Sequence, residues 1–430
     1  MTRVLVIGAG PAGGTAALWL AKAGVSVMLV DGEPRPGGTG WSGSKGDKLR
    51  QDLATAAMES RFGREVIDID GSGRVTLAEQ DGTLERLHPE IVIVAAGGVE
   101  RLLPVSGWTL PGVFTLGALQ LLNKRDGLVP EGPVVLAGSG PLLRLTAGEL
   151  IAAGAHLSAV VDAGPAIGVG LLAGLSGRPV ALAQGVGLEL RRLVAGVPLI
   201  RGWPKVVGGR QAEAVEVNGR RFPAATVGLS FGLVPNTELA RLAGASVDWD
   251  AASRNWTVRR NDNFESDRAN LFFVGDGATV GGADLAVVEG VIAAAGVLER
   301  LGVAVPPALA LALSTARRHL PRLRRAARVL AAWSSAVPPA AVDDDVVVCA
   351  CEGTTVGEVR AALAAGYRQA GPLKLLTRAG MGRCQGRMCA TIVQALASQA
   401  GFVLPPGSVR PPLRPIAAAA FGKDMPYRQQ

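Results

Sequence analysis

The stretch RVLVIGAGPAGG, residues 3–14, joins a short apolar run to a glycine-rich turn, and a helical pattern follows it. This order predicts a strand, a tight turn and a helix. Gly8 permits the turn, Gly10 lets the backbone approach a pyrophosphate, and Gly13 lets the helix pack on the strand. Because the first N–H groups of a helix attract phosphate, the stretch predicts a Rossmann-type dinucleotide site.

A carboxylate stands at the expected distance from this turn. The apolar run VSVMLV, residues 25–30, is followed by Asp31, about twenty residues beyond the glycines, where an acidic side chain accepts hydrogen bonds from the adenosine ribose. A glycine-rich turn without a ligand is the alternative, and the spacing to Asp31 argues against it. The predicted site also includes Pro11 and Ala12 at the start of the helix and Gly32 after the second strand.

Two distant segments indicate which dinucleotide binds. In LFFVGDGATVGGADLAVVEG, residues 271–290, a strand delivers Gly275 and Asp276 to the start of another helix. This pair resembles the second flavin motif of flavoproteins with two dinucleotide domains, where the aspartate binds the ribityl chain, so FAD is favoured over NAD. A helix N-cap is the alternative role of Asp276. IVIVAAGG, residues 91–98, is typical of the strand and turn with which such proteins leave the FAD domain. The remaining predicted FAD contacts are Gly38, Ala96 and Gly97.

A second strand-turn-helix pattern begins with PVVLAGSGPLLR, residues 133–144. Gly138 and Gly140 repeat the first two glycines of the motif, but Leu143 stands where the third is expected. Leu143 implies looser packing of the helix on the strand or an altered phosphate path. Asp162 ends the next predicted strand, where it could hold a ribose. Two alternatives stay open: an adenine nucleotide such as ATP or NAD at this site, or a Rossmann-like fold without a ligand.

The composition favours an α/β chain, since 58 glycines and 4% aromatic residues suit tight turns and closely packed helices. We expect two Rossmann-like dinucleotide-binding domains and a small α-rich domain at the C-terminus. The FAD-binding domain is expected in two parts, residues 1–120 and 222–300, interrupted by the second Rossmann-like domain at 121–221. A helical linker at 301–345 and a cysteine-containing domain with a C-terminal tail at 346–430 complete the chain.

Net charge and hydropathy indicate which kinds of partner and which location to expect. The net charge is +8, but the excess is scattered arginine without the aromatic interleaving that stacked bases need, so no nucleic-acid partner is expected. No run of about eighteen apolar residues has the composition of a membrane helix, so no transmembrane segment is expected and the predicted location is cytoplasmic. A basic helix carries six arginines, for which a solvated face is favoured and a contact with an acidic partner is the alternative. They are Arg317, Arg318, Arg322, Arg324, Arg325 and Arg328.

All four cysteines fall within one window, with the spacing C-x-C followed by C-x4-C. In a chain expected to be cytoplasmic, such a group indicates metal or redox chemistry rather than disulfides. Four thiolates can hold an iron-sulfur cluster or zinc, and zinc ribbons usually have C-x2-C in both halves. The spacing therefore favours iron-sulfur, with zinc and free buried thiols as alternatives. The residues are Cys349, Cys351, Cys384 and Cys389.

The surroundings of the cysteines also suit an anionic cluster. Residues 355–358, TVGE, have the form of a capping box just after the first pair, and Cys389 directly precedes a predicted helix. Both pairs therefore stand near helix N-termini, whose N–H groups and dipoles favour negative charge. Nearby cations should raise the reduction potential of a [2Fe-2S] centre, which fits an electron relay. The cations are Lys374, Arg378, Arg383 and Arg387.

The segments CEGTTVGEVR, residues 351–360, and KLLTRAGMGRCQGRMC, residues 374–389, resemble the bacterioferritin-associated-ferredoxin-like [2Fe-2S] domain. Together with GAGPAGG, AGSGPLL and VGDGATVGGADLAVVEG, the chain resembles the flavin subunit of opine oxidases, hydrogen cyanide synthase and D-hydroxyproline dehydrogenase. The resemblance implies that the four cysteines hold a [2Fe-2S] cluster. It also implies a second flavoprotein subunit that carries the substrate site and oxidises an amino acid or opine.

Further expectations are a downstream electron acceptor, a small additional subunit, and peripheral association with a membrane through the complex. The chain departs from its relatives at TGWSGSKGDKLR, residues 39–50, where they usually show a glutamine and an aromatic-rich stretch. The resemblance therefore does not define the immediate surroundings of the flavin.

No motif nominates a catalytic residue, because His88, His156 and His319 stand outside any recognisable set. No cysteine precedes Cys349, which excludes the redox-active disulfide of the pyridine-nucleotide disulfide reductases. The predicted function is an electron-transfer subunit, containing FAD and [2Fe-2S], of a heteromeric dehydrogenase that oxidises C–N bonds. One alternative is a stand-alone NAD(P)H-dependent ferredoxin-type reductase that uses the second nucleotide site. The other is a non-enzymatic iron-sulfur partner protein.

Overall fold

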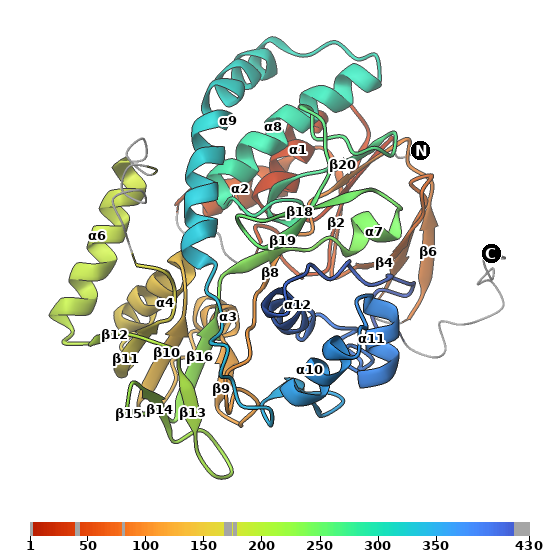
Figure 1. Ribbon diagram of the computed structural model, residues 1–430. Helices are drawn as coiled ribbons and strands as arrows, with labels where there is room; N and C mark the ends of the chain where they lie inside the picture. The colour runs from red at the N-terminus through yellow and green to blue at the C-terminus, as the bar shows by residue number, and fades with distance from the viewer. Residues whose placement is uncertain (1–2, 39–43, 80–81, 167–173, 175–178, 417–430) are drawn as a thin grey trace.

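The computed structural model describes residues 3–38, 44–79, 82–166, 174 and 179–416. Two five-stranded parallel sheets lie side by side, and a small helical module at the C-terminal end of the chain packs against both parts (Figure 1). The predicted α/β class with two Rossmann-like sheets and a small α-rich C-terminal module is confirmed. Among the described helices, none is long and apolar enough to cross a membrane.

The first sheet forms because its strands are apolar on both faces. In β1 (Val4–Ile7), Val4 and Val6 pack into the core under α1 and α8, while Leu5 and Ile7 pack into a second core on the opposite face. The strand order is β20-β7-β1-β2-β3, with β20 at Leu271–Phe273, β7 at Ile91–Val94, β2 at Val27–Asp31 and β3 at Glu59–Phe62. The helices of this part are α1 (Pro11–Lys22), α2 (Ser44–Thr55) and α8 (Ala283–Arg300).

An antiparallel three-stranded sheet and a short helix contribute to the second core. Val75 and Leu77 of β5 and Leu239 of α7 pack there against Leu5 and Ile7. The first sheet is thus covered on both faces, which leaves its carboxyl edge as the place where loops can form a site. These elements are β4 (Glu65–Ile69), β5 (Val75–Ala78), β6 (Leu84–Leu87) and α7 (Glu238–Leu242).

The second sheet has the order β12-β11-β10-β16-β9. β16 (Thr226–Ser230) pairs with β10, and β9 (Val113–Thr115) pairs with β16. The sheet therefore includes two strands from outside the 121–221 segment expected for this module, one before it and one after it. The other strands are β10 (Val134–Gly138), β11 (Leu157–Asp162) and β12 (Leu199–Arg201), and the helices are α3 (Leu116–Asp126), α4 (Pro141–Ala152) and α6 (Pro179–Val194). A small antiparallel sheet adds β13 (Lys205–Val207), β14 (Ala214–Val217) and β15 (Arg220–Pro223).

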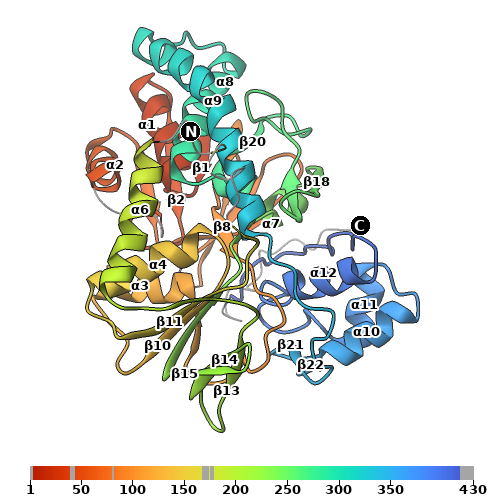
Figure 2. The same ribbon diagram turned by 60° about the vertical axis from the view of Figure 1, so that its left-hand side comes forward.

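Two strands and one long helix connect the modules. The strands β8 (Gly98–Glu100) and β17 (Leu233–Pro235) pair antiparallel where the chain passes between the two sheets. A hairpin, β18 (Val247–Asp250) and β19 (Asn255–Val258), lies beside them. The helix α9 (Pro307–Ser334) packs on α8 at one end and reaches the second sheet at the other, as Figures 1 and 2 show.

The C-terminal module contains β21 (Val347–Cys349), β22 (Thr354–Thr355), α10 (Val356–Ala364), α11 (Ala370–Thr377) and α12 (Ala390–Gln399). It does not form a separate core. Val348 and Ile392 belong to the same hydrophobic cluster as Leu103, Val161 and Val227. The module is therefore fused to the second sheet through continuous apolar packing. The predicted C-terminal tail beyond residue 416 lies outside the described residues.

Candidate functional site

The first glycine turn lies at the carboxyl edge of the first sheet, between β1 and α1. Gly8 has a φ of +104°, and a Cβ there would collide with the carbonyl oxygen of Ala95. A Cβ at Gly13 would collide with the carbonyl oxygen of Gly8. At Gly10, by contrast, the nearest described heavy atom to a Cβ is the Cα of Gly38, at 3.9 Å. The turn is closed against the sheet at Gly8 and Gly13 and open above Gly10, which fits a bound pyrophosphate.

Asp31 closes the other side of this turn. It is the last residue of β2, as predicted, and its Oδ2 accepts a hydrogen bond from the N–H of Ala9 at 2.6 Å. Its Oδ1 accepts from the N–H of Glu33 at 2.8 Å, across Gly32. The half-buried carboxylate therefore has a fixed orientation beside the glycine turn and keeps lone pairs for a ribose.

The second flavin segment meets the first turn although the two are far apart in sequence. A Cβ at Gly275 would lie 2.9 Å from the Cβ of Ala12, and one at Gly277 would lie 3.0 Å from the carbonyl oxygen of Gly97. Asp276 accepts hydrogen bonds at Oδ1 from the N–H groups of Gly281 (2.8 Å) and Gly282 (2.9 Å). Burial raises the pKa of Asp276 above its ordinary value, while the same two N–H groups act in the opposite direction.

The residues predicted to contact FAD lie close together. The open position above Gly10, the oriented Asp31, and the turn containing Asp276 lie along one edge of the first sheet, together with the Ala96–Gly97 turn that follows β7. The predicted FAD contacts are thus brought together by the fold. Residues 39–43 of the stretch that departs from the relatives lie outside the described residues.

A buried ion pair supports the turn that carries Asp276. The Oε2 of Glu289 accepts a hydrogen bond from the N–H of Gly275 at 2.7 Å and one from Nη1 of Arg260 at 2.9 Å. Glu289 is 1% exposed and lies on α8. Sequence reasoning missed this pair, although a carboxylate within the apolar helix pattern AVVEGVIAAAG, residues 286–296, was a usable signal.

A cavity of about 510 Å³ adjoins Asp276. Its walls come from the loop before α8, from the N-terminus of α4 at Pro141 and Leu142, and from Arg324 and Arg328 of α9. The volume falls within the roughly 300–1,000 Å³ typical of sites for small organic molecules. The cavity therefore lies between the module built on the first sheet and the second sheet, next to Asp276, the residue predicted to bind the ribityl chain.

The second glycine turn has different surroundings from the first. A Cβ at Gly138 would collide with the carbonyl oxygen of Ser230, which resembles the closed position of Gly8. A Cβ at Gly140, however, would collide with the Oγ of Ser334, at the C-terminal end of α9. The Oγ of Ser139 also donates a hydrogen bond to the carbonyl oxygen of Ser334 at 2.9 Å. The last turn of α9 thus covers the position that is open at Gly10.

The acidic residue of the second site is also engaged within the chain. Asp162 ends β11, as predicted, and its fully buried carboxylate accepts a hydrogen bond from Nη2 of Arg144 at 2.7 Å. Its Oδ1 accepts from the N–H of Gly164 at 2.9 Å. Leu143 is fully buried in the core beneath α4 rather than aimed at the turn. Leu143 thus fills the core between α4 and the second sheet, and the looser packing or altered phosphate path expected from it stays a prediction.

The four cysteines are brought together by a loop that winds back on itself. Cys349 ends β21 and Cys389 is the N-cap of α12, and both are 2% exposed. Cys351 is exposed and Cys384 is half-buried. A Cβ at Gly382 would collide with the Cβ of Cys351, so the loop approaches the first pair closely. All four are free thiols in the structure, and each interacts electrostatically with at least one other.

The pKa values of the thiols differ with their surroundings. Burial raises the pKa of Cys389 to about 12, and the neighbouring Cys349 adds to the increase. Partial burial acts to raise the pKa of Cys384 too, but the N–H groups of Met388 and Gly386 point at its sulfur and bring its pKa below the ordinary value. The same N–H groups would stabilise a cluster-bound thiolate.

The four thiols supply the ligand set of a two-iron cluster. Within the described ranges, no three His, Cys, Asp or Glu side chains converge closely enough to hold one ion. A two-iron cluster does not require such convergence, because its four thiolates are shared between two irons. The capping box at Thr355 and Glu358 is confirmed, with the N–H of Thr355 donating to Glu358 at 2.8 Å. The residues present fit a [2Fe-2S] cluster.

Two of the four cations expected to raise the cluster's potential are paired with carboxylates. Arg378 forms an ion pair with Glu352 at 2.8 Å, and Arg387 forms one with Glu238 at 3.0 Å. Lys374 and Arg383 are exposed. The expected positive field is therefore weaker than the sequence suggested but not halved, because Glu238 is shared between Arg387 and Arg414.

Arg387 has a second role that the sequence did not indicate. It joins the cysteine loop to the FAD-binding part, since Glu238 lies on α7 and the Nη1 of Arg387 donates to the carbonyl oxygen of Cys384 at 3.2 Å. Thr391 adds a hydrogen bond to the carbonyl oxygen of Leu102 at 2.8 Å. These contacts fix the cysteine loop against the segment that leaves the first sheet.

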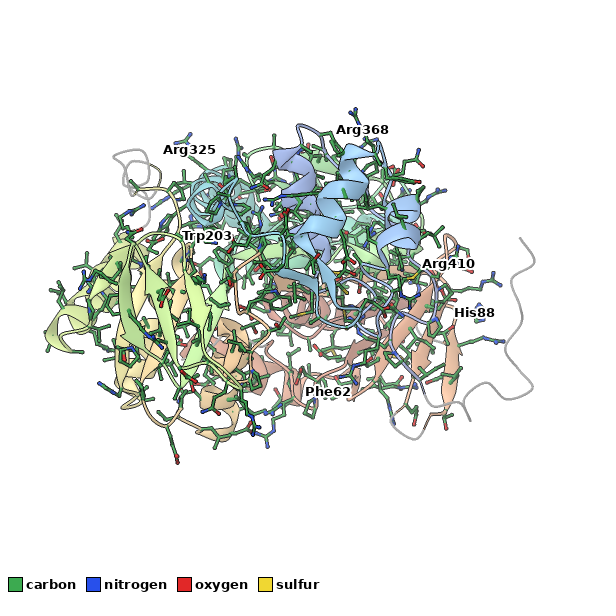
Figure 3. All side chains as sticks on the ribbon, turned by 60° about the horizontal axis from the view of Figure 1, so that its bottom comes forward. Phe62, His88, Trp203, Arg325, Arg368 and Arg410 are labelled. Atoms are coloured by element: carbon green, nitrogen blue, oxygen red, sulfur yellow. The ribbon has the colours of Figure 1, made fainter. Side chains whose placement is uncertain are left out.

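No histidine is placed for proton transfer. His88, His156 and His319 are all exposed, and Figure 3 shows His88 at the periphery of the molecule. On α9, Arg325 points outwards, whereas Arg324 lies over the ring of Phe264 with 5.6 Å between the guanidinium and the ring centroid. Five of the six arginines of the basic helix are exposed, which agrees equally with a solvated face and with a contact surface for an acidic partner.

Two families of known proteins match this chain, one over the two parallel sheets and one over the cysteine module. Residues 2–295 match the family described as pyridine nucleotide-disulphide oxidoreductase, and residues 347–398 match the BFD-like [2Fe-2S] binding domain. An opine oxidase subunit of Rhizobium meliloti (strain 1021) is 35% identical, and the match covers 96% of each chain. The chain belongs to the family of this opine oxidase subunit. The predicted resemblance is confirmed, and the two matched domains imply FAD and a [2Fe-2S] cluster.

Other members and neighbours agree. Hydrogen cyanide synthase subunit HcnB of Pseudomonas aeruginosa is 32% identical to the present chain, and the match covers 97% of this chain and 98% of HcnB. The crystal structure of L-proline dehydrogenase from P. horikoshii matches with a TM-score of 0.73 at 17% identity, over 98% of this chain and 79% of that chain. At that identity the likeness shows the fold alone.

Proposed function

We propose that the chain is the electron-transfer subunit, containing FAD and [2Fe-2S], of a heteromeric enzyme that oxidises the C–N bond of an amino acid, imino acid or opine. The observation that carries the proposal is the presence of two fitted cofactor sites in one rigidly packed chain. One is the open turn at Gly10 with Asp31 and Asp276, and the other is the group of four thiols that Arg387 ties to the FAD-binding part.

The proposed chemistry needs both groups. Oxidising a C–N bond removes two electrons, a [2Fe-2S] cluster passes one at a time, and a flavin exchanges either number. What the chain itself supplies is position: Gly10 leaves room for the pyrophosphate, Asp276 orients the ribityl chain, and the cysteine loop is held against the segment around Leu102. Residues 2–295, which match the oxidoreductase family, therefore form the electron-receiving part in this proposal.

A partner subunit carries the substrate site in this proposal. The relatives are named as subunits, of opine oxidase and of hydrogen cyanide synthase. In this chain all three histidines are exposed, and Asp31 and Asp276 are assigned to FAD. We therefore place the pocket and the proton acceptor in a second flavoprotein subunit. A downstream electron acceptor and a small additional subunit complete the proposed assembly, located in the cytoplasm or at the membrane periphery.

The direct test uses the purified chain alone. We expect it to contain FAD and iron-sulfur, to be reduced by dithionite, and to show no dye reduction with proline-like amino acids, opines or glycine. Activity should appear when the partner subunit is added, because in this proposal only the partner holds the substrate's α-carbon and accepts its proton. Turnover of any of these substrates by the lone chain, above trace rates, would overturn the assignment.

For the second nucleotide site, the structure favours one of the two open alternatives. An adenine nucleotide, whether ATP or NAD, needs the space above Gly140 that Ser334 covers and an acid that Arg144 already holds. We therefore propose that this site takes no nucleotide unless the last turn of α9 moves away.

Mixing with NADH or NADPH tests this second proposal and the reductase alternative together. Stopped-flow absorbance should show little flavin bleaching within seconds, since the covered turn at Gly140 denies the cofactor a place beside the flavin. Dithionite serves as the control that the flavin is reducible. Reduction by NADH at rates comparable with turnover would instead establish the stand-alone reductase. A flavin that stays oxidised in the complete complex with substrate would favour the non-enzymatic alternative.

A further inference from the structure

A second cavity, of about 190 Å³, lies where three parts of the chain meet. The hairpin β18–β19 forms one wall, the segment after α9 forms another, and α12 of the C-terminal module forms the third. It is smaller than the roughly 300–1,000 Å³ of a pocket for a drug-sized molecule, which leaves room for a small ion and not for a dinucleotide. Its polar lining consists of Arg101, Trp249, Arg254, Gln394, Ser398 and Gln399.

Arg101, which lines both this cavity and the larger one beside Asp276, is a buried cation without a counter-ion among the described residues. It follows β8, is 6% exposed, and its side chain makes one long hydrogen bond, from Nη1 to the carbonyl oxygen of Ser253 at 3.5 Å. In the part of the chain that the structure describes, no carboxylate lies within 4.0 Å of its guanidinium nitrogens. An unpaired buried charge is strongly unfavourable, so a group of opposite charge is expected beside it.

Arg254 brings a second positive charge to the same cavity. It lies in the turn of the hairpin with a φ of +53°, a backbone conformation in which glycine would be less strained. Burial, together with the charge of Arg254, lowers the pKa of Arg101 to about 10, so the guanidinium of Arg101 stays protonated at neutral pH. Asp250 of the same hairpin is engaged by the turn, accepting from the N–H of Ser253 at 3.2 Å.

The third wall offers hydrogen-bond donors. Ser398 of α12 accepts a hydrogen bond from Nε2 of Gln394 at 3.3 Å, which leaves its own hydroxyl proton available. Gln399 donates to the carbonyl oxygens of Pro338 (3.0 Å) and Pro339 (3.1 Å), which holds the segment after α9 in place. The cavity thus combines two cations with a free hydroxyl and contains no acidic side chain among its lining residues.

We infer that this cavity binds a small oxyanion, a phosphate or the carboxylate of a small organic acid, between the guanidinium groups of Arg101 and Arg254. Arginine pairs with either anion through two parallel N–H···O bonds, so the two sources share one chemistry. The bound anion would join the hairpin of the FAD-binding part to α12 of the cluster module. Ligand at this junction would therefore stabilise the arrangement of the two cofactor sites.

Calorimetric titration of the full chain with both cofactors tests the site. Inorganic phosphate and malonate are titrated separately in a zwitterionic buffer, with sodium chloride at matched ionic strength as the blank. We expect at least one of the two anions to bind saturably with one equivalent per chain. The anion that binds more tightly then shows whether the cavity takes phosphate or a carboxylate. Arg254→Gln should weaken binding by at least about tenfold. Arg322→Gln removes the same charge from an exposed position on α9 and should change nothing.

Absence of saturable binding for both anions, or equal weakening in Arg254→Gln and Arg322→Gln, would overturn the inference. Arg101→Met provides a second measurement. Because the substitution removes an uncompensated buried charge, it should raise the melting temperature in anion-free buffer and abolish the increase that phosphate or malonate gives. If Arg101 has a structural role only, the variant will melt lower in every buffer, and the anions will not shift the wild-type melting temperature.

Discussion

Gly10→Val is expected to give a folded protein that contains the cluster but little flavin. A Cβ at Gly10 meets no described atom closer than the Cα of Gly38 at 3.9 Å, so the fold itself has room for the side chain. That room is the space assigned to the pyrophosphate, and a valine there displaces it. We expect flavin content below about a tenth of wild type, which corresponds to a loss of more than about 1.4 kcal/mol in binding. Absorbance after denaturation measures the flavin per chain.

Gly371→Val is the matched control. Gly371 is an exposed residue of α11, and a Cβ there also meets nothing within 4 Å among the described atoms. It should retain full flavin content. Gly13→Ala should behave differently from both, because its Cβ would collide with the carbonyl oxygen of Gly8 and destabilise the fold. Full flavin content in Gly10→Val would show that the dinucleotide lies elsewhere.

Cys384→Ser is expected to abolish the cluster and leave the flavin bound. Cys384 accepts N–H groups at its sulfur and faces Cys351, and none of the residues assigned to FAD belongs to its loop. A serine hydroxyl is a poor substitute for a thiolate at iron. Visible absorbance and electron paramagnetic resonance after anaerobic reduction should lose the [2Fe-2S] signal, while flavin per chain stays near the wild-type value.

Arg383→Ser provides the control for that variant, because it changes the exposed residue next to Cys384 and should keep the cluster. Metal analysis of the wild-type protein is the decisive measurement. Stoichiometric zinc without iron would contradict the assignment of the four thiols to a [2Fe-2S] cluster.

Local patterns explain what could be predicted from the sequence. The strand ends at Asp31 and Asp162, the helix starts after both glycine turns, and the capping box at Thr355 all depend on residues close together in the chain. Spacing determines such features through strand alternation, helix periodicity and capping. The grouping of the four cysteines was predictable for the same reason, since one loop brings the second pair back to the first.

Contacts between distant segments could not be predicted in this way. Nothing near Gly140 indicates that Ser334, almost two hundred positions later, covers it. The ion pair between Arg387 and Glu238, and the isolation of Arg101, depend likewise on how the modules pack. A charged side chain carries no local signal of its partner, so the sequence overestimated the free positive charge around the cluster.

The continuous core beneath the cluster module has a kinetic consequence. Ile392 and Val348 pack with Leu103 and Val161, so the iron-sulfur carrier is permanently docked. A carrier that diffuses must find its donor for each electron, and its encounter rate falls on dilution and with ionic strength. Transfer between the two centres of this chain is instead a unimolecular event. Its rate should therefore be independent of protein concentration and insensitive to salt.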